Sequence, residues 1–214
     1  MSQQVLVDEI ACGGTGSKRI IDILLAFVAL VLLAPLMVCV AVTILAVDGR
    51  SPFVGEARVG RRGSGFSLLK FRSTFREPHV HPSARGATSH NAAYGIEGEE
   101  ERKPDQVPRI GHFLRHTGVD NLPHLFNILM GDMSFVGPRP ITRSEVAAYG
   151  EAFDICFSVR PGLTGSWQAS AHTDTSLENR VQHDQQYAET RSLRTDLSIL
   201  CKTVPIVLAG GGNF

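Results

Sequence analysis

The chain has 214 residues, enough for one domain of ordinary size with an appendage and too few for two large domains. Lysine and arginine number 21, as do aspartate and glutamate, so the formal net charge is zero and nothing in the total indicates a nucleic-acid-binding protein. Hydrophobic residues make up 43% of the chain, which argues against disorder. The charge is unevenly distributed, because residues 48–76 carry a net charge of +5.

An apolar segment near the N-terminus is the first feature with a direct structural meaning. From Ile23 to Val47, 25 residues carry no charge. As a helix they would extend about 38 Å, against about 30 Å for the hydrocarbon of a bilayer. A signal peptide has a shorter apolar core closer to the terminus. We therefore expect the segment to stay in the mature protein as a membrane helix.

Composition alone leaves the topology of this helix open. Pro35, in the middle of the run, is expected to kink or break it. Basic residues lie on both sides, with Lys18 and Arg19 before the run and a larger basic group after it, and such flanks favour the cytoplasmic face. A helix that enters and leaves by one face satisfies both flanks, and a kinked spanning helix is the alternative. In both cases residues 48–214 face the cytoplasm.

The next part of the chain predicts a hairpin and a loop. Residues 53–59 and 66–73 are short extended segments on either side of a basic, glycine-rich turn. That turn either lies against anionic headgroups or is a solvated surface loop. Residues 77–108 are poor in large apolar side chains, and we expect a loop of uncertain order there.

Helices are predicted for most of the remainder. Residues 122–130 have apolar side chains at helical spacing, with Asp120 or Asn121 as the N-cap and Gly131 as the stop. The capping-box patterns Thr142-x-x-Glu145 and Thr175-x-x-Glu178 predict the starts of two more helices. Residues 193–208 form an amphipathic helix that either packs in the core or lies on the membrane. The fold class is mainly α with a small β-hairpin (α+β).

Asp120 admits both a structural and a chemical interpretation. A carboxylate at a helix N-terminus is an ordinary cap, and this alone would explain the residue. The same N–H groups also form an anion site, where a carboxylate stays ionised as a nucleophile and an incoming phosphate meets hydrogen-bond donors. Arg115 upstream and Arg139 in Gly137-Pro138-Arg139-Pro140 downstream are candidate phosphate ligands. The residues by themselves favour the plain cap.

Taken together, the motifs resemble those of the bacterial sugar transferases known as monotopic phosphoglycosyl transferases. The resemblance runs from about Lys18 to the C-terminus. It rests on Lys18-Arg19-x-x-Asp22 before a proline-broken apolar segment, Arg58-Val59-Gly60, Lys70-Phe71-Arg72-Ser73, Arg109-Ile110-Gly111-x-x-Leu114-Arg115, Asp120-x-Leu122-Pro123-x-Leu125-x-Asn127-x-Leu129-x-Gly131-Asp132-Met133-Ser134-x-Val136-Gly137-Pro138-Arg139-Pro140, Arg160-Pro161-Gly162-Leu163-Thr164-Gly165-x-Trp167-Gln168 and Asp184-x-x-Tyr187.

The resemblance implies a domain organisation and a cellular location. It divides the chain into an N-terminal tail (1–17), a re-entrant membrane helix broken at Pro35 (18–49) and one compact cytoplasmic catalytic domain (50–214). It implies that the protein lies in the bacterial inner membrane with its catalytic domain toward the cytoplasm. A homo-oligomer is compatible with it, and a nucleic-acid partner is not expected.

The resemblance also implies a reaction. A sugar 1-phosphate passes from a UDP-sugar to undecaprenyl phosphate, with release of UMP, to begin exopolysaccharide or another surface glycan. In this family an aspartate at the position of Asp120 attacks the phosphorus next to the sugar and forms a phosphosugar intermediate. Mg²⁺ neutralises the pyrophosphate, and Asp120 is the expected protein ligand of the ion. Arg115 and Arg139 would bind phosphate, and Asp184 is an auxiliary candidate.

Two positions next to Asp120 depart from the family pattern. The family follows its nucleophile with a glutamate, whereas this chain has Asn121, which cannot take a proton and binds a hard cation more weakly. Where the family commonly has glutamine, this chain has His124, which either orients Asp120 or accepts a proton, or is a solvated surface histidine. Two functions therefore remain: an active transferase, and a catalytically impaired paralogue that binds lipid phosphate or a partner enzyme without turnover.

Overall fold

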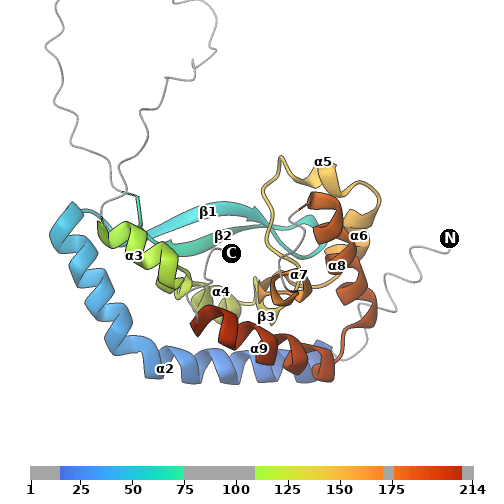
Figure 1. Cartoon of the computed structure of the whole chain (residues 1–214), viewed down its shortest axis with the longest axis horizontal. Coiled ribbons are helices and arrows are strands. Elements are labelled where there is room, and N and C mark those ends of the chain that lie inside the picture. The colour runs from blue at the N-terminus through green and yellow to red at the C-terminus, as the bar shows by residue number, and fades with distance from the viewer. Residues whose placement is uncertain (1–14, 75–108, 171–175, 209–214) are drawn as a thin grey trace, which may run out of the picture.

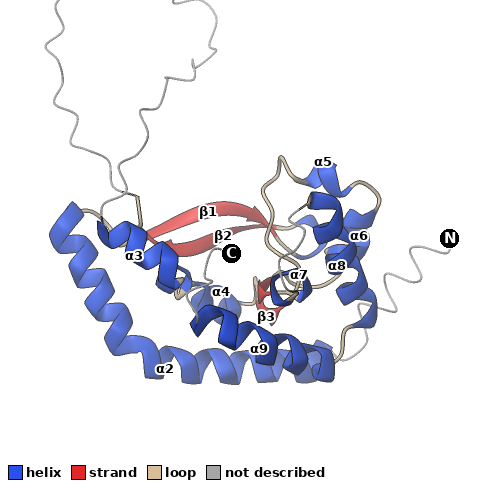
Figure 2. Ribbon diagram, in the orientation of Figure 1, coloured by secondary structure: helices blue, strands red, loops and turns tan. Residues whose placement is uncertain are grey.

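A computed structural model describes residues 15–74, 109–170 and 176–208, and its longest element is helix α2, Thr15–Asp48. The helix continues through Pro35 instead of breaking there, and its ribbon is bent, with one limb under the rest of the molecule and the other rising beside it (Figure 1). By length and composition it could cross a membrane. The rest of the described chain lies on the inner side of this bend (Figure 2).

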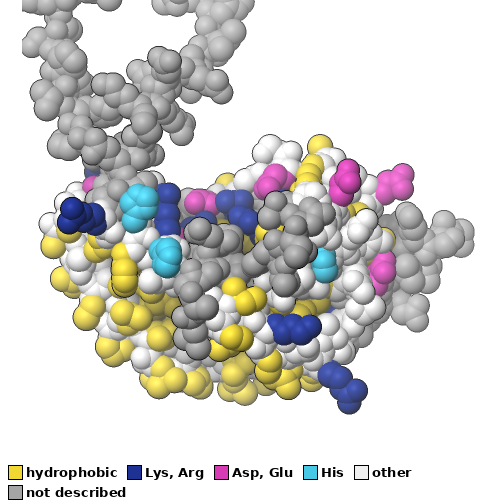
Figure 3. Space-filling view, in the orientation of Figure 1, with side chains coloured by type: hydrophobic (Ala, Val, Ile, Leu, Met, Phe, Trp, Pro, Cys, Tyr) yellow, Lys and Arg dark blue, Asp and Glu magenta, His cyan; other side chains and the backbone are white. Residues whose placement is uncertain are grey.

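Only one face of α2 is buried. Asp22, Ala26, Met37 and Ile44 are covered by the domain. Large apolar side chains are exposed along the rest of the helix, and they form the hydrophobic lower edge of the molecule (Figure 3). The most exposed are Ile20, Leu24, Phe27, Val31, Leu32, Val38 and Val42. A soluble protein rarely exposes so continuous an apolar surface, which is typical of a membrane or partner contact.

The start of α2 is anchored to the domain by two basic residues that the sequence presents as topology signals. The Lys18 ammonium donates to Asp196, to the Tyr187 hydroxyl and to the carbonyl of Val136. The Arg19 guanidinium donates to the carbonyls of Ile128 and Leu129, at 2.6 and 2.9 Å. These two carbonyls lie at the C-terminal end of another helix, where positive charge is favourable, and the Ile128 carbonyl also accepts from the backbone N–H of Gly131.

The predicted hairpin is confirmed. Strands β1 (Phe53–Val59) and β2 (Gly65–Phe71) pair antiparallel, with Phe53 opposite Phe71 and Val59 opposite Gly65. The turn between them contains the 3₁₀ segment η1 (Arg61–Gly63). Its basic residues contact the domain, because Arg61 Nε donates to the carbonyl of Ser158 and the Arg62 backbone N–H to that of Phe157.

The predicted helix after Asp120 is present but starts later. Helix α3 (Arg109–Thr117) ends at Gly118, which adopts the left-handed conformation, and the 3₁₀ turn η2 (Val119–Asn121) follows. Helix α4 (His124–Met130) then begins after Pro123 and ends at Gly131, with φ of 99°, as predicted. An L-residue with a side chain would be strained at this φ, so the glycine fixes the end of the helix.

A second, parallel sheet was not apparent in the sequence pattern. Strand β3 (Ser134–Val136) pairs with β4 (Gly162–Thr164), and each has only three residues. Gly137 and Gly162 meet here so closely that a Cβ on either would overlap backbone atoms of the other segment. This contact explains both glycines, and it joins the loop that carries Arg139 to the 160–164 segment.

Five short or amphipathic helices complete the described chain: α5 (Val146–Tyr149), α6 (Ala152–Cys156), α7 (Ser166–Ala169), α8 (Leu177–Thr190) and α9 (Leu193–Leu208). The cap of α8 is Ser176, whose hydroxyl accepts from the backbone N–H of Asn179, and the predicted cap Thr175 lies outside the described residues. Glu145 accepts from the backbone N–H of Thr142, as the capping box predicts, and directly precedes α5.

Helix α9 packs one face in the core, as one of the two predicted alternatives has it, and exposes apolar side chains on the other. Ile199 and Thr203 are buried against the domain, whereas Leu197 and Val204 are 63% and 55% exposed. The mainly α fold with a small hairpin is confirmed, with the parallel β3–β4 pair added to it. The predicted loop at 77–108 lies outside the described residues.

Candidate active site

Asp120 lies in the 3₁₀ turn η2, before the start of α4, and so it does not cap that helix as predicted. The residue before α4 is Pro123, and no side chain caps α4. Asp120 is buried, and its Oδ1 atom has no hydrogen-bond partner among the described residues. A buried carboxylate oxygen without a partner is costly unless something binds it. The plain cap therefore does not account for Asp120.

The electrostatic surroundings of Asp120 are mixed. Burial raises the pKa of its carboxyl, and the positive charges of Lys70 and Arg115 oppose this rise. Arg115, at the end of α3, is exposed, and its Nε donates to the hydroxyl of Ser73 at 2.9 Å. The predicted phosphate ligand Arg115 is thus close enough for its charge to influence Asp120.

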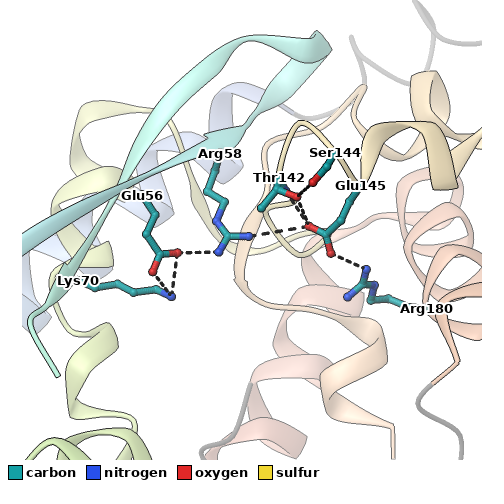
Figure 4. Close-up of polar contacts among 7 residues, drawn as sticks. All are labelled: Glu56, Arg58, Lys70, Thr142, Ser144, Glu145 and Arg180. Atoms are coloured by element: carbon teal, nitrogen blue, oxygen red, sulfur yellow. Dashed lines mark hydrogen bonds and ion pairs between the residues drawn. The ribbon is translucent and has the colours of Figure 1, made fainter. Parts of the chain in front are cut away.

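The charges that face this region come largely from the β-hairpin. The pairing of β1 and β2 places Glu56, Arg58 and Lys70 on one face of the sheet. Glu56 accepts from Arg58 at 2.6 Å and from Lys70 at 3.4 Å, and Arg58 also approaches Glu145, which binds Arg180 (Figure 4). The motifs assign no role to these three hairpin residues, although the two-residue alternation of strand side chains indicates that they share a face.

Asn127 joins the hairpin to the helix after Asp120. It is fully buried, accepts from the backbone N–H of Leu69 at 2.9 Å and donates to the carbonyl of Ser67 at 2.7 Å. Leu69 directly precedes Lys70 in β2. The asparagine in the densest sequence motif is therefore a positioning residue that fixes Lys70 relative to Asp120.

Arg139 is held by its backbone and leaves its side chain available. In the described part of the chain its guanidinium has no carboxylate within ion-pair distance. Its backbone is hydrogen-bonded to Asp184, a fully buried carboxyl on α8 that also accepts from the Tyr149 hydroxyl at 3.0 Å. Burial raises the pKa of Asp184 to about 7. The auxiliary candidate Asp184 thus supports Arg139 from behind.

His124 is not the solvated surface residue that the sequence favoured. It is 7% exposed, and neither ring nitrogen has a hydrogen-bond partner among the described residues. Burial, with Lys70 next in effect, lowers the pKa of its imidazole to about 3. The ring is therefore neutral at physiological pH, with one N–H donor and one acceptor available.

One cavity brings several of these residues together. Asn121, His124 and Arg139 line it with Arg58 and Lys70. Asp120 and Arg115 are not part of its lining, but both act on the same region through their charges. The predicted residues around Asp120 therefore lie in one region, whereas Asp184 lies behind Arg139.

Asp120 supplies one of the oxygen ligands that a hard divalent cation needs. The unpartnered Oδ1 of Asp120 is a carboxylate oxygen, and Mg²⁺ is usually held by one or two carboxylates together with substrate phosphates and water. The described residues contain no group of three or more His, Cys, Asp and Glu side chains arranged to hold a metal. An ion here would thus take most of its ligands from the substrate.

Comparisons with known proteins agree with this arrangement. The family model for the bacterial sugar transferase family matches residues 14–210. The chain is 40% identical to the exopolysaccharide production protein ExoY of Sinorhizobium fredii, over 92% of this chain and 88% of that protein. It is 36% identical to the undecaprenyl-phosphate galactose phosphotransferase of Salmonella typhimurium, over 92% of this chain and 41% of that longer protein.

A third relative is named for the same class of reaction. The UDP-glucose:undecaprenyl-phosphate glucose-1-phosphate transferase of Caulobacter vibrioides is 32% identical, over 89% of this chain and 69% of its own length. The family match covers nearly the whole of the present chain. The chain therefore belongs to the bacterial sugar transferase family and is an enzyme of the phosphoglycosyl transferase class.

Proposed function

We propose that this enzyme transfers a sugar 1-phosphate from a UDP-sugar to undecaprenyl phosphate through a phosphosugar intermediate on Asp120. The observation that carries the proposal is the Asp120 carboxylate itself, buried with an unpartnered oxygen between the charges of Lys70 and Arg115. The names of the relatives supply the donor and acceptor classes. The product would begin exopolysaccharide or another surface glycan, as the name ExoY suggests.

The reaction divides into two displacements at one phosphorus. An oxygen of Asp120 attacks the phosphorus next to the sugar, the bond from that phosphorus to the UMP oxygen breaks, and UMP leaves with the electron pair. A phosphate oxygen of the lipid then attacks the same phosphorus, and Asp120 leaves as a carboxylate. Arg115, Arg139 and Lys70 stabilise the charge on the transferring group. When bound, Mg²⁺ would neutralise the pyrophosphate, with Asp120 as its protein ligand.

The apolar surface of α2 supports the location of this chemistry. We place the exposed face of α2 in the inner membrane as a re-entrant helix, with the domain on the cytoplasmic side. Both ends of the helix are tied to the same domain, through Lys18 and Arg19 at the start and through Arg72, whose Nε lies 3.6 Å from Asp48, at the end. A helix whose two ends attach to one domain is more readily re-entrant than spanning.

The test is UMP release by purified protein in nanodiscs with a panel of UDP-sugars, Mg²⁺ and undecaprenyl phosphate. Asp120→Asn keeps the shape of the side chain and removes the nucleophile, so we expect UMP release to fall by at least about 10³-fold. Wild-type protein given donor alone should carry one sugar phosphate by mass spectrometry of the intact chain. An unmodified chain with full turnover would contradict the covalent intermediate.

A second candidate function follows from Asn121. If the missing carboxylate abolishes turnover, the wild-type chain should release no UMP with any donor, and Asn121→Glu should restore release. Activity of the wild type that Asn121→Glu changes by less than about tenfold would exclude this impaired-paralogue function.

A further inference from the structure

A cavity of about 390 Å³ lies between α2 and the site, and two kinds of side chain line it. One kind is charged or polar and comes largely from the hairpin and the segments around Asp120: Arg58, Lys70, Asn121, His124 and Arg139. The other kind is apolar and includes Ala29 and Leu33 of α2, Leu163 of β4, and Leu200 and Val204 of α9, with the polar Thr164, Gln168 and Thr203 among them. Cationic and apolar side chains in one lining are what an amphiphile with an anionic head requires.

The polar side chains of the lining are suited to an anionic head. Three of them are cationic: Glu56 binds Arg58 and Lys70, and Arg58 also lies 3.9 Å from Glu145. Among the residues that the structure describes, Arg139 has no such acidic partner. A phosphate would find an unneutralised guanidinium with a fork geometry that matches its oxygens.

The apolar part of the lining favours a hydrocarbon chain over a nucleotide sugar. Sugar hydroxyls and pyrophosphate oxygens placed against Ala29, Leu33 and Leu163 would lose hydrogen bonds to water, which is unfavourable. A hydrocarbon chain placed there gains the favourable burial of apolar surface. The cationic and apolar side chains together therefore fit a lipid phosphate better than the soluble donor.

The cavity also meets the surface of the molecule where a lipid would arrive. Its walls belong to α2 and α9, and both helices carry exposed apolar side chains beside it, including Leu32, Leu197 and Val204. In the space-filling view these helices form the hydrophobic lower part of the molecule (Figure 3). These exposed side chains give a prenyl chain apolar surface to contact between the bilayer and the cavity.

His124 is a further candidate contact for the anionic head. It is more than nine-tenths buried, it lines the cavity, and its ring nitrogens lack partners among the described residues. Such a group is normally satisfied by a ligand or an ordered water. A neutral imidazole can donate one hydrogen bond to a phosphate oxygen without adding a charge to a site that already holds three cations.

We propose that this cavity binds the lipid acceptor, with its phosphate at Arg139, Lys70 and His124 and its first prenyl units between α2 and α9. The proposal rests on the proposed function, because it assigns a place to the acceptor of that reaction. It separates the two substrates in space: the donor reaches Asp120 from the side of Arg115, and the lipid reaches it from the membrane side.

Binding is tested first without turnover. Asp120→Asn protein in nanodiscs is irradiated with a prenyl phosphate that carries a diazirine on its first prenyl unit, and labelled peptides are mapped. We expect labels in α9 near Leu200 and Val204 and in α2 near Ala29 and Leu33. Undecaprenyl phosphate should protect these peptides. Equal protection by phosphatidylglycerol, or protection by a UDP-sugar, would overturn the assignment.

The kinetic test uses a matched pair of substitutions on α9. Val204→Trp fills the mouth of the cavity, whereas Leu197→Trp adds the same ring at a similarly exposed position that does not line it. We expect Val204→Trp to raise KM for undecaprenyl phosphate by about tenfold or more and to leave the UMP burst with donor alone unchanged. Leu197→Trp should change both quantities by less than about twofold.

The outcomes distinguish failure of the site from failure of the function. A diminished burst in Val204→Trp with an unchanged KM for the lipid would assign the cavity to the donor and overturn the proposal. Absence of any burst in the wild type would refute the function proposed for Asp120, while the labelling experiment would still decide where the lipid binds. Ala29→Phe narrows the cavity from α2, on the opposite wall, and it should raise the KM for undecaprenyl phosphate as Val204→Trp does.

Discussion

The two walls of the site differ in how they are built. The wall from Arg115 to Arg139 consists of turns, the short helix α4 and the three-residue strand β3, and it supplies the proposed nucleophile. The hairpin wall is a regular two-stranded ribbon, and it supplies the charges Glu56, Arg58 and Lys70. Local backbone conformation therefore positions the Asp120 carboxylate, whereas a long-range contact of the hairpin brings the surrounding charges close to it.

Helix α2 packs against both walls. Near its start, Ala26 lies in a cluster with Leu125 and Ile128 of α4 and with Leu68 of the hairpin. Farther along, Met37 and Ile44 pack with Phe71 of the hairpin and Leu114 of α3. Helix α2 therefore helps to hold the two walls in place relative to each other.

The largest expected effect comes from removing the charge that the hairpin wall brings to Asp120. Lys70→Met keeps the length of the side chain and removes its charge, so kcat should fall by about 10²–10³-fold, as when one electrostatic donor is lost from an active site. Turnover in nanodiscs measures this.

Arg72→Met is the matched control for Lys70. Arg72 follows the same strand, but it binds the carbonyl of Ser51 and approaches Asp48, away from the site. Turnover of Arg72→Met should stay within a few-fold of wild type. Equal losses in both variants would mean that the hairpin acts through stability alone.

The second-largest effect is expected when the hydrogen bonds between the two walls are removed. Asn127→Leu leaves the backbone N–H of Leu69 and the carbonyl of Ser67 buried without partners, which should lower the free energy of unfolding by about 2–4 kcal/mol. Denaturant titration in detergent measures this. Phe126→Leu, on the more exposed side of the same helix, should change it by less than about 1 kcal/mol. A similar loss in both variants would refute the role of Asn127 as the link.

Local patterns predicted the elements of the two walls, and long-range contacts decided what those elements do. The hairpin and the helix ended by Gly131 follow from alternation and from glycine, because both signals are local. The burial of His124 does not follow from local patterns, because it depends on the packing of α4 against elements distant in sequence, and helical spacing leaves this residue ambiguous. The same holds for Lys18 and Arg19, whose acceptors lie more than 100 residues away.

The β3–β4 pair shows a second limit of sequence patterns. Three-residue strands are too short for alternation to be seen, and their partners are separated by the whole of α5 and α6. The position of Asp120 before an apolar helix was evident from the sequence. That it does not cap this helix was not evident, because this depends on the 3₁₀ turn after Gly118.

The smallest expected effect concerns the support of Arg139 and depends on pH. The pKa of the Asp184 carboxyl is raised by burial from 3.8 to about 7, so between these values the folded state holds a proton that the unfolded state has released. Stability should therefore fall as pH rises from about 4 to about 7. Asp184→Asn cannot titrate, so relative to wild type it should gain roughly 1–2 kcal/mol of stability between pH 5 and pH 7.

Thermal unfolding at pH 5, 6 and 7 measures this difference, with Asp154→Asn on the exposed side of α6 as the control that should follow the wild type. A wild-type and an Asp184→Asn curve that remain parallel would show that the Asp184 carboxyl does not hold its proton in this range. The Asp184 carboxyl also holds the backbone of Arg139. If the KM for lipid phosphate changes over the same pH range, the wall that carries Arg139 responds to this titration. The hairpin charges are more exposed, so their contribution should not change with pH in this range.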